Sequence, residues 1–364
     1  MHGSFQNKDT GHFYDDVHLK EIEMNQLQLI GSDGRLGRRD FLKLSTAMGG
    51  IMLMGSAMPA LCATTKRLSI ATGGMGGVYF PMGGGIASLI TKYIPGVEAA
   101  AEVTAASVDN CKLVAAGKSD MGIVMADVAY DALMGTGKFK DKLPIVNLAM
   151  LYSNLMHVVT IDGKGIKSVA DFKGRKVSTG APGSGTEIKA LRVLEAYGLN
   201  PDKDITRDRL GASESAGALK DGKIDAYFWD GGVPTASVLD IASTPGTRIS
   251  LLSHGDAVDK MTAKYGPVYF KSIIPKGTYS GVDSDVSVAA VGNILIANAD
   301  MDPKLAYDIL NAMFSHLPEL IAVHKEAENI QLITAPVGSP LPFHKGAMQF
   351  YQEKGITIQG YAKP

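Results

Sequence analysis

Two glycine-dense loops constrain the fold of this chain most, because each follows a short apolar run and precedes a helical pattern. They cover residues 69–81 and 178–187. Glycine permits positive φ and close backbone approach, so such a loop can point several unpaired N–H groups at one place, where the following helix N-terminus adds its positive dipole end. The pattern predicts two anion-binding loops. Tight turns between strand and helix are the alternative for each loop.

Neither loop carries a nucleotide-binding motif. The Gly-Lys-Ser/Thr ending of a phosphate loop and the Gly-x-Gly-x-x-Gly spacing are both missing from them. About a hundred residues separate the loops, which favours two lobes that each offer one loop to a shared ligand. In α/β folds that ligand lies at the carboxyl ends of the strands.

Apolar runs alternate with helical patterns through the first half of the chain, which predicts an α/β fold with mostly parallel sheets. The predicted strands and helices there are 68–71, 86–93, 97–103, 108–116, 121–125 and 127–133.

The second half repeats the alternation. Ser184 and Glu187 have capping-box spacing at the beginning of a helix that runs to Tyr197, with Gly198 as its end. Further apolar stretches at 145–152 and 157–161, a long strand at 286–298, and amphipathic helices at 303–320 and 344–354 complete the pattern. Residues 116–127 and 221–232 share a Gly-Lys-x-Asp turn before a buried strand, which indicates a weak internal repeat with one copy per lobe.

The N-terminus resembles an export signal. Gly37-Arg38-Arg39-Asp40-Phe41-Leu42-Lys43 is a twin-arginine pattern, and a Gly/Ala/Met-rich apolar stretch follows at 44–60. Cleavage is expected near Ala63, with export to the periplasm, so that the mature protein is not embedded in the membrane. A membrane-spanning helix is the alternative, although Gly49, Gly50, Gly55 and Pro59 interrupt a segment at the short limit for spanning.

The composition is that of a globular protein, with a net charge of −1 and 45% hydrophobic residues. This balance, without a basic patch, argues against nucleic acid as a partner. Cys111 is the one cysteine left after cleavage at Ala63, so the mature chain has no internal disulfide. Its helical context predicts a buried small side chain rather than a catalytic thiol.

Four motifs then occur in one order along the mature chain, at 72–84, 126–130, 180–186 and 222–226. With this set the chain resembles the TAXI family, the extracytoplasmic solute receptors of TRAP transporters. The resemblance implies an α/β, two-lobed periplasmic-binding-protein type II fold with a ligand cleft between lobes joined by crossing strands. It also implies a small carboxylate ligand such as glutamate, glutamine or a related dicarboxylate, no cofactor or metal, and a TRAP-type membrane permease as partner.

The resemblance divides the chain into an N-terminal extension with signal (1–63), lobe 1 (64–156), lobe 2 (157–288) and a return to lobe 1 with C-terminal helices (289–364). The lobes are expected to close by a hinge near 157–161 and 286–295. The residues implied to bind the ligand are Gly73, Gly74, Met75, Gly76, Gly77, Tyr79, Ser107, Asn110, Asp127, Ala181, Gly183, Ser184, Gly185, Thr186, Trp229 and Asp230.

Several of these residues have a structural alternative. Tyr79 and Trp229 are equally consistent with core packing, whereas the position of Asp127 favours a helix N-cap over a ligand contact. Asp230 departs from the family pattern, so it is expected either to pair with a ligand ammonium or to cap the helix after it. Relatives also often carry threonine in place of Met75 and Val78.

Two other function classes stay open. The histidines are scattered and no Ser, His and acid pattern or zinc motif occurs, which disfavours an enzyme. A periplasmic ligand sensor or adaptor could use the same fold.

Overall fold

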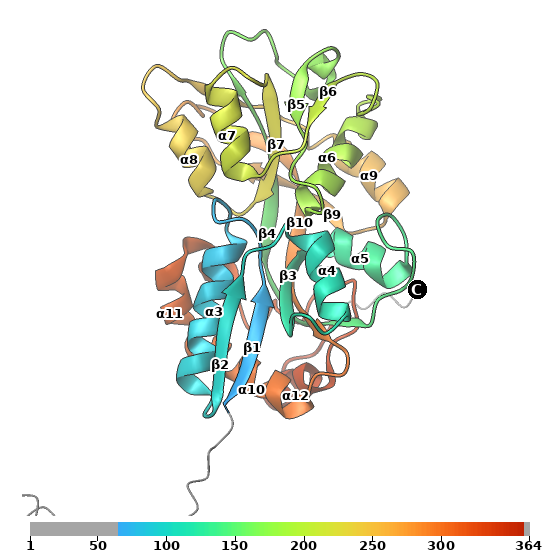
Figure 1. The fold of residues 1–364 in the computed structure, drawn as a ribbon, viewed down its shortest axis with the longest axis vertical. Helices are drawn as coiled ribbons and strands as arrows, with labels where there is room; N and C mark the ends of the chain where they lie inside the picture. The colour runs from blue at the N-terminus through green and yellow to red at the C-terminus, as the bar shows by residue number, and fades with distance from the viewer. Residues whose placement is uncertain (1–64, 360–364) are drawn as a thin grey trace, which may run out of the picture. The chain divides into compact units, whose positions relative to one another are not determined.

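The computed structural model describes residues 65–359 and shows a two-lobed α/β fold, as the sequence predicted (Figure 1). The twin-arginine pattern and the expected cleavage site lie outside the described residues. Among the helices of residues 65–359, none has the length and apolar character needed to cross a membrane. The strands form one ten-stranded sheet in the order β2-β1-β3-β10-β4-β7-β5-β6, with β8 paired to β4 and β9 to β10.

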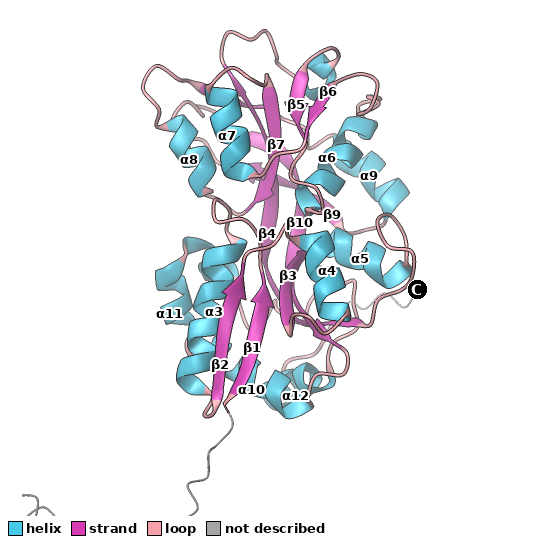
Figure 2. Ribbon diagram, in the orientation of Figure 1, coloured by secondary structure: helices cyan, strands magenta, loops and turns pink. Residues whose placement is uncertain are grey.

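Lobe 1 contains a parallel unit of three strands with a helix after each (Figure 2). All five residues of β3 are buried, as expected for a strand covered on both faces. The expected strands and helices of this half are confirmed with small shifts at their ends, except that the helix expected at 86–93 already begins at Tyr79. Their bounds are β1 (Lys66–Ala71), α3 (Tyr79–Tyr93), β2 (Val97–Glu102), α4 (Ser107–Ala115), β3 (Met121–Met125) and α5 (Ala126–Met134).

Lobe 2 repeats this arrangement, with β5 parallel to both β6 and β7. Its elements are η1 (Val169–Phe172), β5 (Lys176–Ser178), α6 (Gly185–Ala196), β6 (Thr206–Asp208), α7 (Ala212–Lys220), β7 (Ala226–Gly231), α8 (Ala236–Ala242), β8 (Ile249–Leu251), α9 (Ala257–Tyr265) and β9 (Tyr269–Ile274).

Two long antiparallel strands, β4 (Ile145–Ile161) and β10 (Val286–Asn298), run through both lobes. The prediction of separate stretches at 145–152 and 157–161 was wrong, because one continuous strand covers both. The polar centre of this strand has the sequence of a break, but Asn154 is buried there and forms hydrogen bonds with Asn293 of β10 and the Asp230 carbonyl. The predicted strand at 286–298 is confirmed.

The C-terminal segment packs on lobe 1. The single helix predicted at 303–320 is two helices that meet at His316. Pro318 lies in the first turn of the second helix. Proline has no N–H to continue the first helix, and its ring would clash with the carbonyl four residues before it, so the first helix ends before this position. The C-terminal elements are α10 (Pro303–Ser315), α11 (Leu317–Val323), η2 (Lys325–Asn329) and α12 (Lys345–Glu353).

The internal repeat has a structural counterpart. In lobe 1 the carboxylate of Asp120 accepts a hydrogen bond from the Ser69 N–H of β1, at 2.8 Å. In lobe 2 the carboxylate of Asp225 accepts one from the Lys176 N–H of β5, at 2.9 Å. The aspartate of each Gly-Lys-x-Asp turn therefore fixes the first strand of its own lobe.

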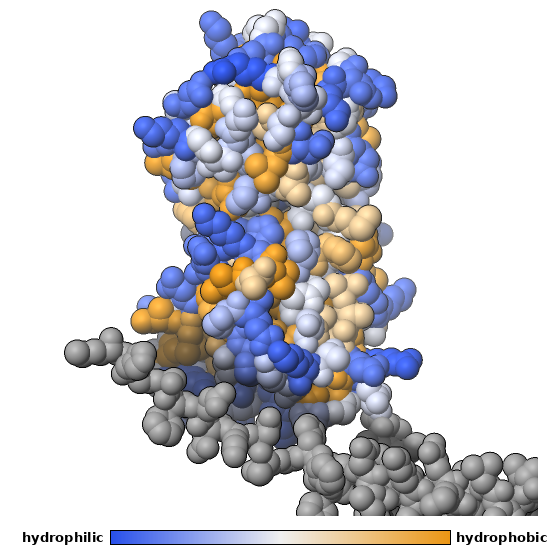
Figure 3. Space-filling model, turned by 90° about the vertical axis from the view of Figure 1, so that its left-hand side faces the viewer, coloured by the Kyte–Doolittle hydropathy of each residue, from blue (hydrophilic) through white to orange (hydrophobic). Residues whose placement is uncertain are grey.

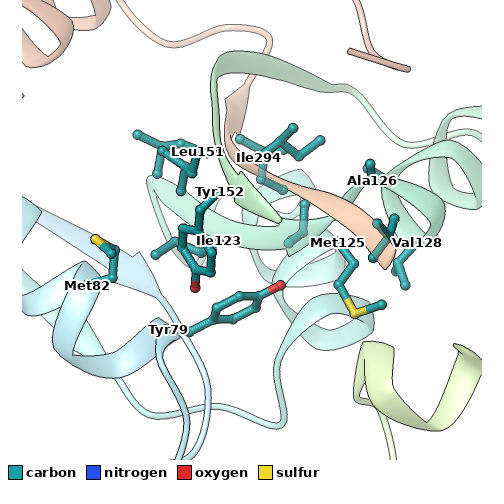
Figure 4. Packing of buried hydrophobic residues seen from close by; sticks show 14 of the residues in the cluster. Tyr79, Met82, Ile123, Met125, Ala126, Val128, Leu151, Tyr152 and Ile294 are labelled. Atoms are coloured by element: carbon teal, nitrogen blue, oxygen red, sulfur yellow. The ribbon is translucent and has the colours of Figure 1, made fainter. Parts of the chain in front are cut away.

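Apolar side chains fill the space around the sheet in both lobes. In lobe 1 the ring of Tyr79 extends from the beginning of α3 toward Met125 of β3 (Figure 4). Cys111 is fully buried in α4, as its context predicted, and burial raises the pKa of its thiol. Figure 3 shows a face that is mostly hydrophilic at the outer end of lobe 2, with apolar side chains gathered around the middle of the molecule.

Candidate functional site

A cavity of about 360 Å³ lies between the two lobes. Both glycine loops contribute to its wall, together with the ends of β3 and β7 and the beginning of α7. It therefore lies at the carboxyl ends of the strands, where the alternating pattern predicted a ligand.

Four helices in residues 65–359 begin at the wall of this cavity: α3, α4, α6 and α7. The first N–H groups of a helix have no partner inside the helix and lie at the positive end of its dipole. At α4 two of these groups are already occupied, because the N–H groups of Val108 and Asp109 donate to the Gly183 carbonyl of the opposite lobe. The other three helix beginnings remain able to donate to a ligand.

The first glycine loop works by close approach rather than by unusual backbone geometry. None of its glycines between residues 73 and 77 has φ in the left-handed region, so the expected need for positive φ was wrong there. A side chain at Gly76 would lie 2.1 Å from the Ser213 hydroxyl, and one at Gly77 would lie 2.9 Å from the Trp229 ring. Both contacts join lobe 1 to lobe 2, so small residues here let the lobes meet.

The second glycine loop combines positive φ with close approach to the opposite lobe. Gly180 and Gly183 have positive φ, at 97° and 85°. A side chain at Gly185 would lie 2.3 Å from the Met125 sulfur and 2.8 Å from the Ser107 hydroxyl, which both belong to lobe 1.

Ser184 caps α6 as predicted, since its hydroxyl accepts a hydrogen bond from the Glu187 N–H at 3.0 Å. The expected capping box is incomplete, because the Glu187 carboxylate instead binds Arg207 and Arg209. The N–H groups of Gly185 and Thr186 have no acceptor among residues 65–359 and lie on the cavity wall.

Three expected ligand contacts do not line the cavity, and each has a structural role instead. The side-chain amide of Asn110 donates to the carbonyls of Ala71, Thr72 and Ile123, which ties three segments of lobe 1 together. Gly183 uses its carbonyl to cap α4.

Asp127 lies in the first turn of α5 but is neither the N-cap nor a wall residue. Its carboxylate accepts a hydrogen bond from the Tyr269 hydroxyl at 2.7 Å and lies 3.6 Å from the Arg192 guanidinium. Arg192 also pairs with Asp131. Since Arg192 belongs to α6 and both aspartates to α5, this buried ion cluster joins the lobes.

Asp230 lines the cavity and already has a cation. Its carboxylate lies 3.1 Å from the Lys189 ammonium, and both side chains are fully buried. Burial raises the pKa of Asp230 to about 6, against the opposing effect of Lys189. One carboxylate oxygen, Oδ2, has no partner among the described residues. The expected helix-capping role was wrong, because Thr235 precedes α8.

Tyr79 forms part of both the core and the wall. Its hydroxyl donates to the Asn293 side chain, and Asn154 lies 3.4 Å away. Trp229 is half-buried on the wall, with its ring against Gly77. The expected contact residues that do line the cavity are Gly73, Gly74, Met75, Gly76, Gly77, Tyr79, Ser107, Ala181, Ser184, Gly185, Thr186, Trp229 and Asp230.

Residues 211–214, at the beginning of α7, form a wall segment that the sequence did not predict. A Gly-Ala-Ser-Glu sequence after a short strand is a helix-start signal that would have indicated it. The strand is only three residues long, which hid the turn. The other wall residues not expected are Val78, Thr104, Ala105, Ala106, Met125, Asn154 and Gly231.

The described wall contains no lysine, arginine, histidine or cysteine, and its charged residues are Glu214 and Asp230. Any anion held there is therefore bound by helix N–H groups and hydroxyls rather than by a side-chain cation. Residues 65–359 contain no group of three or more His, Cys, Asp or Glu side chains that could hold a metal ion.

Comparison with known proteins places the chain in a family. The model of the NMT1-like family matches residues 70–355, and the chain belongs to that family. Among solved structures, it is similar to the periplasmic aliphatic sulphonate binding protein SsuA from Escherichia coli, with 16% identity over 73% of this chain and 80% of that one, at a TM-score of 0.42.

Two further solved structures are similar at the same level. A putative L-cystine ABC transporter protein from Listeria monocytogenes has 16% identity over 73% of this chain and 98% of that one, at a TM-score of 0.45. A protein from Bordetella bronchiseptica RB50 has 20% identity over 73% of this chain and 76% of that one, at a TM-score of 0.49. At such identities the ligand has to be argued from the cavity itself.

Proposed function

We propose that this protein is an extracytoplasmic solute-binding receptor that captures a small anion between its two lobes. The observation that carries the proposal is the convergence of α3, α6 and α7 on one cavity, with N–H groups able to donate at the beginning of each. Oriented N–H groups at helix beginnings favour negative charge. Contacts from both lobes make the cavity a site that closes around its ligand.

A small carboxylate is the ligand class that this geometry supports best. A volume of about 360 Å³ fits a small solute rather than a polymer. Glutamate, glutamine and related dicarboxylates fit the requirement for at least one carboxylate. Asp230 does not require a ligand ammonium, since Lys189 already compensates its charge.

Delivery to a TRAP-type permease completes the proposal. The four co-ordered motifs that resemble the TAXI family support this assignment, together with the twin-arginine pattern that would send the mature protein to the periplasm. A ligand sensor or adaptor with the same fold is the second candidate. Deletion of the gene would abolish uptake of the bound solute if the protein is a transport receptor, and would leave uptake intact if it is a sensor.

Native mass spectrometry of the purified mature protein tests the proposed ligand class directly. A tight receptor is expected to retain a small carboxylate through purification and to release it on denaturation. Ligand addition should also raise the melting temperature, because binding to the folded state alone stabilises it. Turnover of the retained molecule during incubation would instead identify an enzyme.

A further inference from the structure

Trp229 is the only tryptophan of the chain and forms part of the cavity wall. Its indole N–H donates to the Thr235 hydroxyl at 3.1 Å. That hydroxyl in turn donates to the Gly232 carbonyl at 2.6 Å. The tilt of the indole ring is therefore fixed from the lobe 2 side by one threonine.

The hydrogen bonds continue from Thr235 to a crossing strand. The Thr235 N–H donates to the Tyr279 hydroxyl at 2.9 Å, and the same hydroxyl lies 2.9 Å from Nε2 of His157. Nδ1 of His157 lies 2.8 Å from the Leu155 carbonyl, which can only accept. The proton of neutral His157 is therefore on Nδ1, and Tyr279 donates to Nε2.

Burial supports this assignment, because it lowers the pKa of His157 to about 4 and so keeps the ring neutral at pH 7. Each polar hydrogen of this hydrogen-bond network, from Trp229 to His157, then has one acceptor. A fully satisfied buried network of this kind holds its members in a single arrangement.

The two ends of the network lie at functionally different places. His157 belongs to β4, the strand that runs through both lobes, and pairs there with Trp229 of β7. At the other end, the ring atoms Cζ2 and Cη2 of Trp229 lie against Gly77 of lobe 1, within 2.9 Å of where a side chain at Gly77 would begin. The network thus reaches from the crossing strand to the contact between the lobes.

We propose that Thr235, Tyr279 and His157 are positioning residues for Trp229. They fix the tilt of the indole, so that this side chain is already in the orientation that meets Gly77 when the lobes close on the ligand. Preordering a wall side chain removes an entropy cost from binding. The inference rests on the proposed function only for its effect on affinity, since the position of Trp229 can be measured without ligand.

The fluorescence of Trp229 provides the test, because no other tryptophan contributes. Thr235→Val removes the acceptor of the indole N–H, and Tyr279→Phe removes the next link. Tyr227→Phe is the matched control, since Tyr227 is buried in the same apolar cluster and its hydroxyl has no partner among the described residues. Thr235→Ser keeps the hydroxyl and should restore the wild-type signal.

In the ligand-free protein, we expect Thr235→Val and Tyr279→Phe to shift the emission maximum and to increase quenching by acrylamide, while Tyr227→Phe and Thr235→Ser match the wild type. With L-glutamate as the probe, loss of one hydrogen bond should raise Kd about fivefold. Thermal unfolding monitored by circular dichroism shows whether each variant is folded.

Emission and quenching in Thr235→Val that equal those of Tyr227→Phe would overturn the proposal. A shift in Thr235→Val with none in Tyr279→Phe would overturn the part played by Tyr279 and His157. If glutamate does not bind any variant but the ligand-free signals change as expected, the positioning network stands and the proposed ligand class fails.

Discussion

Replacing Gly185 by alanine should weaken ligand binding without unfolding the protein. The added methyl would lie 2.3 Å from the Met125 sulfur and 2.8 Å from the Ser107 hydroxyl, far inside van der Waals contact. Both neighbours belong to lobe 1, whereas Gly185 begins α6 of lobe 2. The clash therefore arises only when the lobes meet, and the open protein can relieve it by parting them.

The size of the effect follows from this contact. Forcing one extra methyl into a packed region costs about 1–3 kcal/mol. If the closed, ligand-bound state bears that cost alone, Kd rises about 5- to 150-fold. Alanine is a better helix former than glycine, and Gly185 has no positive φ, so the melting temperature of the ligand-free protein should not fall.

Isothermal titration calorimetry with L-glutamate measures the change in Kd, and Gly74→Ala is the control. Gly74 lines the same cavity and lacks positive φ, but a side chain there would meet no atom within 4 Å. Equal affinity of Gly185→Ala and Gly74→Ala would refute the reasoning that the lobes close onto Gly185.

Three further predictions concern buried ionisable side chains. Burial lowers the pKa of His254 to about 4, so the stability that this side chain contributes is present above pH 6.5 and is lost as the pH falls from 6.5 to 4, by roughly 3 kcal/mol. His254→Gln should therefore flatten the pH dependence of the free energy of unfolding, measured with denaturant, across that range. An unchanged pH dependence would contradict the buried neutral ring. Asp230→Asn leaves Lys189 buried without its counter-ion and should destabilise the fold by about 3–5 kcal/mol. The affinities for glutamate and 2-oxoglutarate should change by the same factor in calorimetry. A loss of affinity for glutamate alone would instead show that Asp230 pairs with a ligand ammonium. Arg192→Met removes the cation that joins α5 to α6 in the closed state and should increase the radius of gyration of the ligand-saturated protein in X-ray scattering. An unchanged radius would show that the ion cluster does not hold the lobes together.

Local patterns predicted the fold well where one element follows another in sequence. The buried run at 121–125 and the apolar run at 286–298 match β3 and β10 at both ends. The pattern failed at Asn154, because a polar residue in the middle of a strand looks like a break until its partner is known. That partner, Asn293, is far away in sequence and only the folded sheet brings the two amides together.

In the candidate site, too, local features could be predicted from the sequence and contacts between distant residues could not. Ser184 and the glycines of both loops could be found from the sequence, since helix caps and tight turns are local features. The role of Asp230, on strand β7, could not, because its cation Lys189 comes from helix α6, 41 residues earlier in the chain. The same holds for Asp127, whose partners Arg192 and Tyr269 belong to the opposite lobe.

Calorimetric titration of the mature protein with a matched set of solutes tests the central claim most directly. The set contains glutamate, glutamine, 2-oxoglutarate, a C4-dicarboxylate and a neutral sugar. Helix N–H groups converge on a cavity whose wall, within residues 65–359, holds no side-chain cation. This predicts that at least one carboxylate binds with one molecule per protein and that the sugar does not. Tight binding of the sugar, with no heat from any carboxylate, would contradict the account.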